Sequence, residues 1–215
     1  ACEAYFADCR ADGIEPEQPY FRKWRHFSRL FGQLHPDLDG PGFDQGQPWS
    51  LFAVPDLRVV VAGLNSTVAH SHPTLAEPGV LGESQVDWFA RHLDPFTRAG
   101  HLRIGVVAHV PAAGADAGWA LADAASFDRV LGDHLDVVLS GGGEAAEEGV
   151  GGLPSGAALV TPPSGGTRLV HVTHGGLDSW TLPDDASAAT RSRRTWTRDA
   201  RPFTAPTGSG PLIVD

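Results

Sequence analysis

The sequence lacks most of the features that mark a special class of protein. Among its 215 residues there is no methionine, a single lysine (Lys23) and only two cysteines, Cys2 and Cys9. On one helix the two cysteines would share a face but lie too far apart for a disulfide. No apolar run approaches the ~18 residues of a membrane-spanning helix, and no signal peptide is visible. We therefore expect a globular protein of the cytoplasm with reduced thiols and no membrane partner.

The chain also lacks a general basic field. Its formal net charge is −10 at pH 7, which argues against binding to a nucleic-acid backbone. Residues 184–201 interleave arginines with Trp196, a pattern that can bind single-stranded nucleic acid. In a chain of this charge, contact of those arginines with acidic patches of the protein itself is the better interpretation. We do not expect nucleic acid as a partner.

Motifs of several enzyme classes are missing as well. The sequence has no Gly-x-Ser-x-Gly elbow, no phosphate-binding Gly-Lys-Ser/Thr loop and no Gly-x-Gly-x-x-Gly between a strand and a helix. The signatures of α/β-hydrolases, P-loop enzymes and dinucleotide-binding domains are therefore absent.

What the sequence does contain is an alternation of strand and helix patterns. Apolar, β-branched runs at residues 57–62, 103–108 and 135–139 alternate with amphipathic helical patterns at 83–93 and 122–131. Short runs of this kind, bounded by Gly and Pro, are typical of parallel strands that are covered on both faces. At this length the chain fits one domain with a sizeable core. The sequence predicts an α/β fold.

The flanking regions carry weaker patterns. Residues 20–34 predict an amphipathic helix with an aromatic face, and residues 51–54 predict a strand that precedes the alternating units. Residues 157–161 and 167–173 have the spacing of a hairpin or an antiparallel edge.

Polar residues follow the predicted parallel strands at the points where they end. His109 follows the strand at 103–108, and Glu144 follows the strand at 135–139 after three glycines. Open α/β sheets place their chemistry beyond these carboxyl ends, so both residues would lie on one rim. Asn65 and Ser66 end the strand at 57–62, where they form either a plain turn or part of a site.

The order of these elements resembles the C-terminal half of the calcineurin-like metallophosphoesterases. In that family the strand equivalent to 103–108 ends in a metal-binding His two residues before a Pro, as His109 and Pro111 do here. The next strand ends in Gly-His-x-His, and both of its His bind metal. Those two positions hold Gly142 and Glu144 in this chain. Segments 57–67, 82–93 and 153–161 also resemble elements of the family.

The resemblance implies a layered α/β sandwich of the metallophosphoesterase type, here incomplete. It also implies, in intact relatives, phosphoester hydrolysis by a pair of divalent metal ions (Mn, Fe or Zn). The family's N-terminal Asp-x-His, Gly-Asp and Gly-Asn-His motifs are absent, so we expect a fragment. Residues 1–182 would be the C-terminal part of the domain, and residues 183–215 a polar, Arg-rich tail. The candidate metal ligands are His109 and Glu144.

Two ligands are too few for a two-metal site, which needs a bridging carboxylate and several His or Asn side chains. We therefore expect no cofactor in the isolated chain and a degenerate phosphoesterase that is inactive alone. Two alternatives stay open: a non-catalytic interaction module, and one half of a hydrolase that another segment completes. The expected partners are accordingly the missing N-terminal segment or a second copy of the chain.

Overall fold

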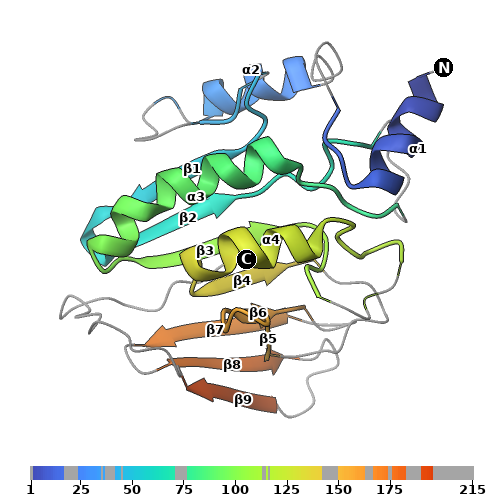
Figure 1. Ribbon diagram of the computed structural model, residues 1–215. Coiled ribbons are helices and arrows are strands. Elements are labelled where there is room, and N and C mark those ends of the chain that lie inside the picture. The colour runs from blue at the N-terminus through green and yellow to red at the C-terminus, as the bar shows by residue number, and fades with distance from the viewer. Residues whose placement is uncertain are drawn as a thin grey trace.

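A mixed sheet of six strands forms the centre of the fold (Figure 1). The computed structural model describes residues 2–16, 24–34, 36, 42–44, 46–70, 77–112, 115, 117–141, 150–162, 167–173, 176–182 and 190–195. The strands lie in the order β1 (Ser50–Val54), β2 (Val59–Gly63), β3 (Leu102–Val107), β4 (Val137–Ser140), β6 (Ala158–Val160) and β5 (Val150–Gly152). Strands β2, β3, β4 and β6 are parallel, while β1 and β5 are antiparallel edge strands. The predicted α/β fold is confirmed.

Two helices cover one face of this sheet (Figure 1). Helix α3 (Glu83–Arg98) buries Val86, Phe89 and Leu93, whose spacing of three and four residues puts them on one face. The shorter helix α4 (Ala124–Leu131) packs beside α3. Together with the strands they enclose the main core, which includes Leu51, Val60, Ala62, Val107, Phe127, Leu131 and Val138.

A second sheet of three antiparallel strands packs against the opposite face. It consists of β7 (Thr167–Thr173), β8 (Gly176–Leu182) and β9 (Thr190–Thr195), with β8 in the middle. The two sheets share an apolar cluster of Leu102, Val137, Leu139, Val160, Val170, Val172 and Leu177. Strand β9 contacts β5. The second sheet therefore covers the half of the main sheet that contains β4, β6 and β5.

Two helices precede the main sheet. Helix α1 (Cys2–Asp12) contains both cysteines; Cys9 is buried and forms no disulfide, and burial raises the pKa of its thiol. Helix α2 (Arg25–Leu34) confirms the helix predicted for residues 20–34 over the part that the structure describes. None of the helices in the described ranges combines the length and the apolar character needed to cross a bilayer.

Of the two arrangements predicted for the later strands, the hairpin is wrong, whereas the antiparallel edge fits β7, which pairs antiparallel with β8 at the edge of the second sheet. Residues 157–161 and 167–173 do not form a hairpin, because β6 joins β4 and β5 in the main sheet while β7 pairs with β8. A period of two predicts a strand but does not specify its neighbour. Residues 190–195, assigned to the tail by the sequence, form β9 on the edge of β8. Residues 183–189 and 196–215 lie outside the described part of the chain.

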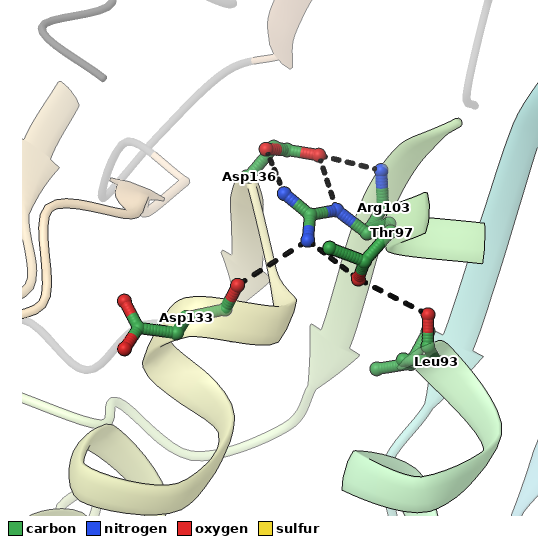
Figure 2. A network of polar contacts seen from close by, with 5 residues as sticks. All are labelled: Leu93, Thr97, Arg103, Asp133 and Asp136. Carbon is green, nitrogen blue, oxygen red and sulfur yellow. Dashed lines mark hydrogen bonds and ion pairs between the residues drawn. The ribbon is translucent and has the colours of Figure 1, made fainter. Parts of the chain in front are cut away.

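A buried ion pair joins the amino ends of β3 and β4 to α3 (Figure 2). Nε and Nη2 of Arg103 donate to the Asp136 carboxylate at 2.9 and 2.5 Å, and the Arg103 backbone N–H donates to it at 2.9 Å. Nη1 donates to Oγ1 of Thr97 at 2.7 Å and to the carbonyl of Asp133 at 3.2 Å. Thr97 in turn donates to the Leu93 carbonyl at 3.1 Å. Arg103 is only 7% exposed, so these partners replace the water that would otherwise stabilise its positive charge.

Removing one member of this pair should cost more than removing both. Asp136→Asn leaves the guanidinium buried without its counter-charge, and we expect the free energy of unfolding to fall by about 3 kcal/mol. Adding Arg103→Met removes that charge, so the double variant should be more stable than the sum of the two single effects predicts. Urea unfolding followed by circular dichroism measures all four proteins. Strictly additive effects would contradict the coupling.

Candidate functional site

The carboxyl ends of the parallel strands bring distant segments together on one rim. Strand β2 is followed by residues 64–67, β3 by residues 108–111 and β4 by Gly141. This is the position at which open α/β sheets bind ligands. The sequence-based expectation that His109 lies on this rim agrees with the structure, which also brings it against Ser66 of the segment after β2.

His109 has both ring nitrogens hydrogen-bonded within the protein. Nδ1 lies 2.7 Å from Oγ of Ser66, and Nε2 lies 3.0 Å from the carbonyl oxygen of Glu77. A neutral ring with its proton on Nε2 satisfies both contacts, because Nε2–H donates to the carbonyl and Nδ1 accepts from the hydroxyl. His109 is 5% exposed and Ser66 is 1% exposed. In this tautomer only Nδ1 has a lone pair available for bonding, and it accepts a hydrogen bond from the Ser66 hydroxyl in a site buried from solvent.

The surroundings fix the position of the His109 ring. A Cβ atom on Gly79 would lie 2.4 Å from Cγ of His109, so the ring packs on a backbone that only glycine can provide. The ring of His70 stands almost perpendicular to it, with 5.2 Å between centroids, and the ring of Trp119 lies 6.3 Å away. Nε2 of His70 lies 3.2 Å from the carbonyl oxygen of Pro78.

This environment keeps His109 neutral. Burial lowers its pKa to about 4, and the electrostatic effect of the neighbouring His70 side chain acts in the same direction. The hydrogen bond to the Glu77 carbonyl favours the charged ring and opposes both effects only in part. At pH 7 the side chain is therefore an uncharged, internally bonded ring.

Asn65 builds the turn after β2. Its Oδ1 accepts from the backbone N–H and the hydroxyl of Thr67 at 3.0 and 2.8 Å, and its Nδ2 donates to the carbonyl of Pro48 at 2.8 Å. Fully buried Gln85 of α3 accepts from the Asn65 N–H at 2.7 Å and donates to the Asn65 carbonyl at 3.0 Å. Of the two interpretations left open for Asn65, these contacts favour the structural turn.

The second candidate ligand, Glu144, lies outside the residues that the structure describes. The description of this loop ends at Gly141, whose N–H donates to the carbonyl of Val107 at 2.9 Å. A Cβ atom on Gly141 would lie 2.1 Å from the carbonyl oxygen of Ala108. The ends of β3 and β4 thus converge where only glycine fits. That His109 and Glu144 bind one metal together stays a prediction.

Sequence analysis missed two carboxylates near the start of α3. Asp123 accepts from the backbone N–H groups of Leu81 and Gly82 at 3.1 and 2.8 Å, and Glu15 accepts from the hydroxyl of Ser84. Burial raises the pKa of both carboxyl groups. An Asp just before a helix predicts a cap for that helix, but Asp123 instead binds a segment about 40 residues earlier. Sequence offers no signal for such a distant contact.

Comparison with known proteins leaves the family undecided. No family model matches this chain, and no curated protein matches it. Within the described ranges, no three His, Cys, Asp or Glu side chains lie close enough together to hold a metal ion. The resemblance to the metallophosphoesterases stays a prediction.

Acid should destabilise the protein through His109. The pKa of the ring is about 4 in the folded chain and 6.5 as the reference value, so the unfolded chain binds the proton first as the pH falls. The neutral His109 ring makes its full contribution to the free energy of unfolding above pH 6.5. This contribution is lost between pH 6.5 and about 4 and is at most about 3 kcal/mol.

The matched variant is His109→Gln, whose side chain does not titrate. Its free energy of unfolding should fall less than that of the wild type between pH 6.5 and 4, as urea unfolding at a series of pH values would measure. The same pH dependence in both proteins would contradict a buried, neutral ring.

Proposed function

We propose that this chain is an α/β domain of the metallophosphoesterase type that does not hydrolyse phosphoesters by itself and acts by binding another polypeptide. The observation that carries the proposal is the pair of hydrogen bonds that occupies both ring nitrogens of His109. It bears on the one rim histidine that the sequence singled out as a metal ligand.

The contacts of His109 resemble those of a metal-binding histidine, except that a serine hydroxyl lies where the metal ion would be. A metal-binding His typically donates one ring N–H to a carbonyl or carboxylate and uses its other nitrogen for the ion. The bond from Nε2–H to the Glu77 carbonyl fits that pattern. At Nδ1, where an ion would bind, lies the buried hydroxyl of Ser66. Metal binding would have to displace that hydroxyl and recruit further ligands.

The same contacts argue against a serine hydrolase. A distance of 2.7 Å between Ser66 Oγ and a His nitrogen fits a nucleophile and its base. In such sites a carboxylate usually orients the base and stabilises the imidazolium that forms. Here the other nitrogen faces a neutral carbonyl, the pKa of His109 is about 4, and Ser66 is 1% exposed. Proton transfer to this ring is unfavourable, and substrate has no access to the hydroxyl.

The proposal predicts no stoichiometric metal and no metal-dependent hydrolysis. Calorimetric titration with Mn²⁺ and with Zn²⁺ should give no saturable site at His109, and bis(p-nitrophenyl) phosphate should not be hydrolysed above background. His109→Ala should reduce stability but leave both readouts unchanged, which also controls for a contaminating hydrolase. Binding of about two ions per chain, lost together with hydrolysis in His109→Ala, would overturn the proposal.

A further inference from the structure

Helix α1 packs on the rim segments that follow β2 and precede α3, and it lies beside the start of α3 (Figure 1). Its buried Cys9 forms an apolar cluster with Val68, Ala69 and Val80. None of the described side chains of α1 belongs to the main core between the sheet and helices α3 and α4. A segment whose apolar contacts lie in a small cluster of its own can open while the rest of the fold stays closed.

Arg10 fastens α1 to the rim through two polar contacts. Its Nη1 donates to the carbonyl of Ala69 at 2.9 Å and lies 3.1 Å from Oε2 of Glu77. The side chains of Arg10 and Glu77 are 11% and 20% exposed, so water screens this ion pair only in part. The carbonyl of the same Glu77 accepts the hydrogen bond from His109. Arg10 therefore connects α1 to the residue that positions the His109 ring.

Glu15, in the segment after α1, makes a second contact at the start of α3. The N-cap residue of α3 is Gly82, which has a φ of +82° and no side chain that could cap the helix. Glu15 reaches this position from far away in the sequence and accepts a hydrogen bond from the hydroxyl of Ser84 in the first turn. A Cβ atom on Gly82 would lie 2.5 Å from Oε2 of Glu15, so the carboxyl group rests on the glycine backbone.

Two carboxyl groups meet at Gly82. Asp123 accepts from its N–H at 2.8 Å, while the buried Oε2 of Glu15 has no hydrogen-bond partner among the described residues. Burial raises the pKa of both groups, and the negative charges of Asp123 and Glu83 raise that of Glu15 further. The hydrogen bond from Ser84 opposes these effects only in part. Ionising both carboxyl groups therefore puts like charges close together where water is scarce.

We propose that residues 2–16 form a strap over the rim, which opens as a unit when Glu15 and Asp123 are both ionised. In the closed strap one of the two carboxyl groups keeps its proton. Opening moves Glu15 into water, breaks the contacts of Arg10 and uncovers the apolar cluster around Cys9. The strap thereby controls access to the rim beside His109, where open α/β sheets bind ligands. This device goes beyond the proposed function and does not depend on what the rim binds.

The direction of the pH effect follows from the raised pKa of Glu15. The closed strap binds the proton of this carboxyl group more tightly than the open strap, in which the group has its ordinary pKa of 4.5. The strap is therefore held most firmly below pH 4.5 and loosens as the pH rises through the raised pKa. His109 acts in the opposite direction, because its protonation destabilises the fold as the pH falls.

Cys9 reports on the strap because its thiol is buried beneath it. In a Cys2→Ser background it is the only thiol of the chain, and dithiodipyridine reacts with it when the strap opens. The rate in the folded protein, divided by the rate in the urea-unfolded protein at the same pH, gives the open fraction. We expect this fraction to depend much less on urea than global unfolding does, because opening of the strap exposes little surface.

Three variants of this background locate the contacts that hold the strap. Glu15→Gln keeps the shape of the side chain without its charge, and at pH 7.5 Cys9 should react about fivefold more slowly than in the parent, with no difference near pH 4.5. Arg10→Gln removes the ion pair and should speed the reaction about tenfold. Asp94→Asn neutralises a carboxylate near the other end of α3, in an exposed pair with Arg98, and should react as the parent does.

A reaction of Cys9 that occurs only with the urea dependence of global unfolding would overturn the strap as a separate unit. Equal rates for Glu15→Gln and the parent at pH 7.5, or an equal slowing in Asp94→Asn, would overturn the role of Glu15. If Arg10→Gln fails to fold, the comparison with Glu15→Gln still decides, because that variant is expected to hold the strap more firmly. Metal binding and hydrolysis test the proposed function and leave this result unchanged.

Discussion

The parallel register of β3 with β4 is the constraint on which the rest of the structure depends. The buried pair of Arg103 and Asp136 holds this register from the amino ends of both strands and connects it to α3 through Thr97. At the opposite ends the same register brings the backbone of Gly141 against Ala108. The charged contacts thus lie at one end of the sheet, and the rim with His109 lies at the other.

At that rim the chemistry of one histidine depends on what its Nδ1 faces. A neutral ring has a single nitrogen lone pair, which can bind a metal or accept a proton from a hydroxyl, but not both. In this protein the hydroxyl of Ser66 takes it, and the Gly79 backbone fixes the ring in that place. The result is a rim built for internal bonding, with Asn65 and Gln85 also bonded to the backbone. Among the described residues of this rim, the polar side chains of His109, Asn65 and Gln85 are thus engaged within the protein.

The sequence predicted local elements well and long-range partners poorly. The β-branched runs correctly predicted β2, β3 and β4, and the helical spacing of Val86, Phe89 and Leu93 correctly predicted α3. These predictions succeed because burial of one or both faces of an element requires apolar residues at regular positions in the sequence. The position of His109 followed from the end of its strand. Other contacts join segments that the local pattern does not connect. They are the pairing of β6 with β4 and of β7 with β8, the contact of Ser66 with His109, and the hydrogen bonds of Asp123 to the segment before α3. No local pattern specifies such contacts.

The most direct test of the account is the protonation state of the His109 ring, measured by ¹⁵N–¹H correlation NMR of the imidazole nitrogens. The account predicts one tautomer, with the proton on Nε2 and Nδ1 as a hydrogen-bond acceptor, that stays neutral at pH 6. Excess Zn²⁺ should leave both ¹⁵N shifts unchanged. A ring that exchanges between tautomers, titrates near pH 6.5, or shifts its Nδ1 resonance on addition of Zn²⁺ would contradict it.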